Sequence, residues 1–94
     1  MNLPKFCCDI LSEKASEAGR KGFSVLMAKM KTEEKYYFVL QCRSADFDSH
    51  GDKAFVSQIA IHYCPWCGSK LADLITTNPE DFAEMEKSTR HLIL

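Results

Sequence analysis

Cys64 and Cys67 are the residues whose types and spacing point most clearly to chemistry. Two cysteines separated by two residues can direct both sulfurs to one point, as a tetrahedral zinc site requires. Pro65 fixes the backbone after the first cysteine, and Gly68 permits the positive φ that lets the chain fold beneath a metal. This stretch therefore predicts one half of a zinc knuckle.

A tetrahedral site needs two further ligands, and the adjacent cysteines Cys7 and Cys8 are the first candidates. Adjacent side chains diverge on a strand or a helix, so both can reach one metal only from a turn. A helix that begins directly after them would provide this turn and would lower the pKa of the thiols. The predicted metal ligands are Cys7, Cys8, Cys64 and Cys67.

If one cysteine of the N-terminal pair is a buried core residue instead, other residues must complete the site. The alternative ligands are Cys42, His50 and His62. For Cys42 we favour a place in the core, and for His62 a place on the surface. His50 lies in an acidic loop that lacks the spacing of a calcium site.

The composition indicates a small folded protein of 94 residues, of which 46% are hydrophobic, with a formal net charge of −1. The length predicts a single domain, residues 1–94. The near-neutral charge argues against a large electrostatic footprint for nucleic acid. We expect neither a secretory signal nor a membrane span, and therefore a cytoplasmic protein whose reduced thiols bind metal rather than form disulfides.

The elements that must position these cysteines follow from the pattern of hydrophobic residues. The expected elements are a helix over residues 9–18, strands over 23–30, 35–43 and 54–63, and a helix that begins at Asn78-Pro79. Periodicity alone also allows a helix over 23–30. On the third strand, we expect the face with Phe55, Ser57, Ile59, Ile61 and Tyr63 to meet the core. The predicted fold class is α+β and zinc-ribbon-like: a three-stranded antiparallel meander with an N-terminal and a C-terminal helix.

The two ends of the chain resemble a family. The pair Cys7-Cys8 and the stretch Tyr63-Cys64-Pro65-Trp66-Cys67-Gly68-Ser69-Lys70-Leu71 are similar to those of small zinc-ribbon-like proteins of bacteria and phages. The resemblance implies zinc bound by Cys7, Cys8, Cys64 and Cys67. Most members of this family have no assigned activity, and some look like accessory or immunity-type proteins, which implies binding rather than catalysis.

For the function, we therefore expect a non-enzymatic protein with structural zinc (Zn²⁺) that acts as a small interaction module for an unidentified protein partner. The alternative is a nucleic-acid-binding zinc ribbon, since Lys29, Lys31, Lys35 and Arg43 flank two tyrosines. A glutaredoxin-like thiol redox protein is less favoured. In this sequence Gly68 interrupts the helix that such a motif needs, and only 27 residues follow Cys67.

Overall fold

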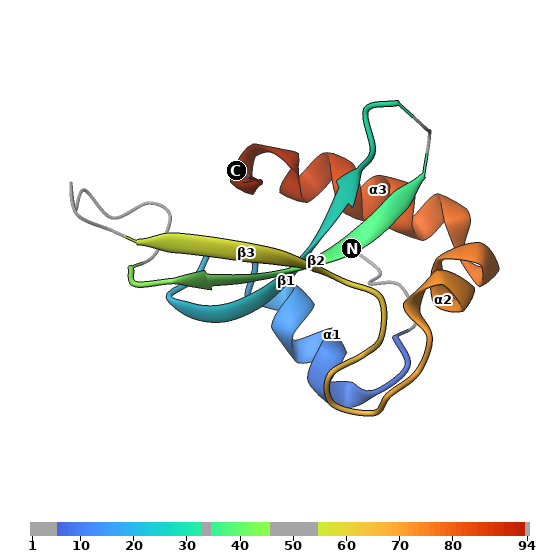
Figure 1. Ribbon diagram of the computed structural model, residues 1–94, viewed down its shortest axis with the longest axis horizontal. Coiled ribbons are helices and arrows are strands. Elements are labelled where there is room, and N and C mark those ends of the chain that lie inside the picture. Colours follow the sequence, from blue (N-terminus) through green and yellow to red (C-terminus); the bar gives the residue numbers. More distant parts are fainter. Residues whose placement is uncertain (1–5, 33–34, 46–54, 94) are drawn as a thin grey trace.

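The computed structural model describes residues 6–32, 35–45 and 55–93, which form an α+β fold (Figure 1). The elements are α1 (Asp9–Ser16), β1 (Gly22–Lys29), β2 (Tyr36–Arg43), β3 (Val56–Ile61), α2 (Leu71–Thr77), α3 (Pro79–Thr89) and the 3-10 turn η1 (Arg90–Leu92). The predicted fold class is confirmed, with a helix first and a helix last. His50 and the acidic loop around it lie outside the described residues.

The three strands form the predicted antiparallel meander in the order β1-β2-β3. Val25 lies opposite Leu40, and Leu40 lies opposite Ile59 on the next strand. Five consecutive residues of β1 are buried, because both faces of the sheet are covered at this strand. This two-sided burial explains why periodicity alone could not distinguish a strand from a helix over this run.

The core has two parts, one on each face of the sheet, because successive strand residues point to opposite faces. The larger cluster consists of Leu11, Val25, Met27, Phe38, Cys64, Leu71 and Phe82. The smaller cluster consists of Leu26, Ala28, Val39 and Leu92. The aromatic rings of Phe38 and Phe82 meet edge to face with their centroids 5.3 Å apart, which fixes α3 against β2. The metal candidate Cys64 therefore belongs to the main core.

Helix α3 begins at Pro79 after Asn78, as predicted, and packs mainly on β1. It joins the two parts of the core, because Phe82 lies in the larger cluster and Leu92, just beyond the helix, lies in the smaller one. The carbonyl oxygen of Leu92 accepts hydrogen bonds from the buried side chains of Gln41 and Arg43, at 2.8 and 3.1 Å. The turn η1 is thereby fixed to the sheet.

The prediction for the inner face of the third strand held at Ile61, which packs against the larger cluster, and was wrong for the rest of that face. Phe55, Ile59 and Tyr63 are 81%, 64% and 60% exposed. Helices α1 and α3 pack on β1 and α2 packs on β2, so no helix among the described residues covers β3 to the same extent. Alternation of apolar residues identifies a buried face only where another element covers it.

Helix α2 was not among the elements expected from the sequence. It begins directly after the knuckle, and the residues Leu71, Leu74 and Ile75 all pack toward the larger cluster. Their spacing of three and four residues places them on one side of a helix. Within the described parts of the chain, no helix is both long and apolar enough to cross a membrane.

Candidate metal centre

The sulfur atoms of all four predicted ligands lie within 4.8 Å of one another. They come from chain segments about sixty residues apart: Cys8 Sγ is 3.7 Å from Cys64 Sγ, and Cys7 Sγ is 3.2 Å from Cys67 Sγ. Both N-terminal cysteines thus lie against both cysteines of the knuckle. The four residues form a group that could hold a metal ion.

Backbone hydrogen bonds shape the knuckle that carries Cys64 and Cys67. The Gly68 N–H donates to the Cys64 carbonyl at 2.8 Å, and the Cys64 N–H donates to the Ser69 carbonyl at 2.8 Å. Gly68 has φ +80°, the left-handed conformation that glycine adopts without steric cost. This tight turn returns the chain, so that Tyr63 and Lys70 lie opposite each other as an antiparallel bridge.

The start of α1 carries the other two cysteines. Cys8 is the N-cap residue of α1 with φ −157° and ψ 163°, so its backbone is extended while its carbonyl accepts the Ser12 N–H. Cys7 and Cys8 lie in a bend, which confirms the turn that the sequence required for two adjacent ligands. In Figure 1 the loop between β3 and α2 passes beside this start of α1.

The cluster lies at the border between core and solvent. Cys64 is 2% exposed and belongs to the larger hydrophobic cluster, against which Cys7 and Cys8 pack as partly buried residues. Cys67 is exposed. A metal ion bound here would be covered by protein on the Cys64 side and would lie near water on the Cys67 side.

The thiols differ in their affinity for protons. The Ser69 hydroxyl, 3.3 Å from Cys67 Sγ, together with the Ser69 backbone and then the Cys7 thiol, lowers the pKa of Cys67 to about 6 by hydrogen bonding to its thiolate. Burial, followed by hydrogen bonds with Cys67 and Cys64, raises the pKa of Cys7. The Leu11 amide lowers the pKa of Cys8, but burial and the neighbouring thiols raise it by more. A cation that replaced these protons would relieve the repulsion between neighbouring thiolates.

The dimensions of the cluster fit a tetrahedral thiolate site. With Zn–S bonds of about 2.3 Å, sulfur atoms at tetrahedral positions lie about 3.8 Å apart. Two sulfur–sulfur distances of 3.2 and 3.7 Å and the upper limit of 4.8 Å bracket this value. Four protein ligands would fill a tetrahedral shell and leave no position for a substrate or a reactive water.

The alternative ligands that the structure describes lie apart from this group. Cys42 is a half-buried residue of β2, opposite the exposed residues Phe23 and Ser57, and it belongs to neither part of the core, so the predicted place in the core was wrong. His62 is exposed, and neither residue belongs to the sulfur cluster. The sequence interpretation missed Ser69, whose signal is a hydroxyl residue two positions after the second cysteine of a knuckle.

No protein-family model, no curated protein and no solved structure matches the chain significantly. The assignment of a role to this cluster therefore depends on its own geometry and chemistry.

Proposed function

We propose that the four cysteines bind a structural Zn²⁺ ion and that the protein is a non-enzymatic interaction module whose shape this ion maintains. The observation that carries the proposal is the convergence of four sulfur atoms from Cys7, Cys8, Cys64 and Cys67 within 4.8 Å. An all-thiolate set is typical of structural zinc, and its four protein ligands leave no open position for catalysis. Hard cations such as Mg²⁺ and Ca²⁺ prefer oxygen ligands.

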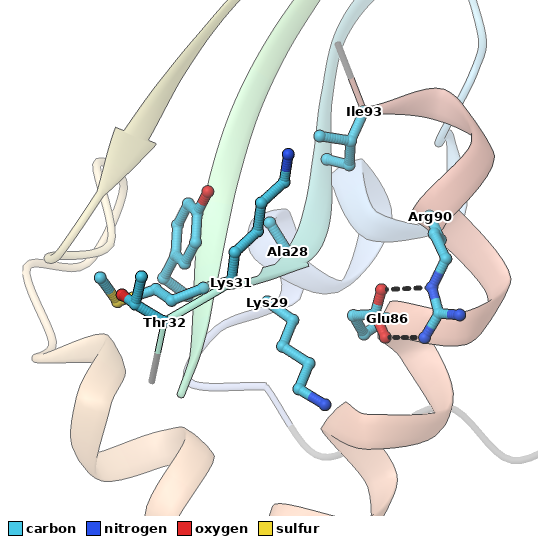
Figure 2. A pocket seen from close by; sticks show the side chains of 9 residues that line it. Ala28, Lys29, Lys31, Thr32, Glu86, Arg90 and Ile93 are labelled. Carbon is cyan, nitrogen blue, oxygen red and sulfur yellow. Dashed lines mark hydrogen bonds and ion pairs between the residues drawn. The ribbon is translucent and has the colours of Figure 1, made fainter. Parts of the chain in front are cut away.

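The groove between β1 and α3 supports a role in protein binding (Figure 2). It has a volume of about 460 Å³, and its apolar lining includes Ala28, Tyr37 and Ile93. Lys29 and Lys31 contribute positive charge, while Arg90 is held by two hydrogen bonds to Glu86. Cations beside an apolar lining fit a protein segment that carries an acidic side chain next to an apolar one.

The nucleic-acid alternative receives less support from the arrangement of the basic residues. Arg43, one of the four cations of the predicted stripe, is buried and donates hydrogen bonds to Gln41 and to the Leu92 carbonyl. Tyr36 and Tyr37 are half-buried and point to opposite faces of β2. They therefore do not form one stacking platform for bases.

Metal analysis tests the structural part of the proposal. We expect elemental mass spectrometry to find one zinc per chain in the wild type and in Cys42→Ser, and a strongly reduced zinc content in Cys7→Ser, Cys8→Ser and Cys64→Ser. Removal of zinc by a chelator should lower the melting temperature strongly, because metal binding and folding are coupled. An unchanged melt after verified zinc loss would show that the ion is not structural.

Affinity capture tests the interaction part. The bait is the zinc-loaded full chain, and the matched variant is Lys29→Glu/Lys31→Glu, whose substitutions lie on the groove. We expect a specific protein to bind the wild type and not the variant, at moderate salt. Binding to single-stranded nucleic acid that weakens steeply with salt would favour the alternative function instead.

A further inference from the structure

The two outer edges of the sheet differ in how they are protected. At β1, α3 lies along the edge, and the Thr89 hydroxyl accepts a hydrogen bond from the Met27 N–H and lies within hydrogen-bond distance of the Met27 carbonyl. β3 is the last strand of the sheet, and no strand within the described residues lies beside its outer edge. An unprotected edge strand is a template for pairing with another chain.

Backbone geometry identifies which groups β3 presents at this edge. The Ser44 N–H donates to the Phe55 carbonyl, so Phe55 is directed toward β2, and so is every second residue after it. The backbone groups of Val56 and Ala60 therefore point to the outer edge. His62 follows the same alternation, because its carbonyl accepts the Leu71 N–H on that side.

The sequence of β3 lacks the features that usually prevent edge pairing. The run from Phe55 to Tyr63 contains no Lys, Arg, Asp, Glu or Pro. Three large apolar side chains point to one face of this run, Phe55, Ile59 and Tyr63, and they are 81%, 64% and 60% exposed. These features favour association and provide no charge to oppose it.

We infer that β3 pairs antiparallel with β3 of a second copy of this chain, about a two-fold axis at Gln58. In this register Val56 lies opposite Ala60 of the second copy, so their outward backbone groups can exchange hydrogen bonds. Phe55 lies opposite Ile61 of the second copy, and Ile59 lies diagonal to Ile59 of the second copy, within reach of side-chain contact. Each copy contributes the same surface, the outer edge of β3, as a closed two-fold interface requires.

The knuckle limits the register. Leu71 lies on the outer side of His62, so an added strand cannot extend along β3 beyond Ile61. Pairing about Gln58 places Phe55 of the second copy opposite Ile61 and therefore ends at this boundary. Registers shifted toward the knuckle would place the second copy in the space of Lys70 and Leu71.

The exposed area suits a second copy. Phe55 and Ile59, which lie within the paired run, together expose on the order of 300 Å², given the size of such side chains. This is more than a third of the ~800 Å² per partner that a stable interface buries, before the strand backbone and the polar side chains beside it are counted.

Sedimentation of the zinc-loaded full chain under reducing conditions tests this inference. We expect the wild type to dimerise, and Ile59→Lys and Ile59→Glu to dimerise at least about tenfold more weakly, because each places like charges close together across the axis. An equimolar mixture of these two variants should form the heterodimer. The control Ile10→Lys, which changes an exposed residue of α1 in the same way, should behave as the wild type.

Hydrogen exchange of the wild type provides a second readout that requires no substitution. The amides of Val56 and Ala60 should become more protected as the protein concentration rises, whereas those of Ser57 and Ile59 should be protected by β2 at every concentration. A wild type that stays monomeric up to about 1 mM, or an Ile59→Lys variant that dimerises equally well, overturns the inference. The zinc content is measured separately, so failure here leaves the proposed metal centre unaffected.

Discussion

The hydroxyl oxygen of Thr89 lies 3.2 Å from the backbone nitrogen and 3.0 Å from the carbonyl oxygen of Met27. A side chain near the C-terminus thereby occupies the place of a neighbouring strand at the outer edge of β1. Both residues are buried, at 6% and 0% exposure, so water cannot easily replace this partner.

Replacing Thr89 by Val keeps the shape of the side chain but removes this hydroxyl. We expect Thr89→Val to lower the free energy of unfolding by about 1–3 kcal/mol, because two buried backbone groups of Met27 lose a partner. Thr89→Ser retains the hydroxyl and is the control, with a smaller loss. Urea denaturation of the zinc-loaded proteins measures both values, and equal loss in the two variants would contradict the explanation.

Glu86 should make stability depend on pH in the acidic range. Its buried carboxylate accepts two hydrogen bonds from Arg90, at 2.9 and 2.6 Å, which lower its pKa below the usual 4.5. A lowered pKa in the folded state stabilises the protein above the unfolded value, and this stabilisation is lost as the pH falls through the folded value.

The pH dependence is measured as a difference between the wild type and Glu86→Gln. We expect the wild type to be more stable at pH 7, and the gap in free energy of unfolding to shrink as the pH falls below 4.5. Acid would also protonate the cysteines and release a metal bound there, but this affects both proteins and cancels in the difference. A gap that stays constant down to pH 3 would contradict a role for the Glu86 charge.

Gly68 is predicted to be important for its conformation and not for its size. An added Cβ would meet no atom within 4 Å, yet the residue has φ +80°. Gly68→Ala should therefore cost about 1 kcal/mol of stability from backbone strain alone. Gly68→Asn, which tolerates this conformation better, should cost less. Denaturant unfolding of the zinc-loaded chain compares the two, and the reverse order would contradict the argument.

Ser69 should tune metal affinity without being a ligand. Its hydroxyl lies 3.3 Å from Cys67 Sγ and stabilises the thiolate form. We expect Ser69→Ala to weaken zinc binding about tenfold, the range typical of residues that support a metal ligand. Ser69→Thr keeps the hydroxyl and should bind zinc as the wild type does. Competition with a chromophoric chelator at pH 7 gives both affinities.

The sequence was most informative where residue type alone restricts the geometry. Spacing and the Pro65/Gly68 context identified one half of the sulfur cluster, and the need for a turn before a helix identified the other. The meander followed from runs of β-branched and aromatic residues around turn-forming segments. These features are local, so they can be recognised without knowledge of tertiary contacts.

The errors arose where distant segments decide the outcome. The exposure of Ile59 could not be recognised, because the alternation of apolar residues along β3 does not show which of them another element covers. The burial of Arg43 depends on the position of Leu92, which is 49 residues away in the sequence. Likewise, the hydroxyl of Thr89 reaches the backbone of Met27 only because α3 lies along β1.

With a metal bound, the chain would form a closed ring from Cys7 to Cys67 that contains α1 and all three strands. Closing a ring of about sixty residues restricts the unfolded chain, an entropic effect on the order of 4 kcal/mol in the chain-entropy description of cross-links. Helices α2 and α3 lie outside the ring. Helix α2 attaches to the core through Leu71, and α3 attaches through Phe82 and the hydroxyl of Thr89. A single cut of the backbone between two strands would therefore leave both fragments tethered through the metal, whereas a cut after Cys67 would release the two C-terminal helices from any covalent or coordinate link.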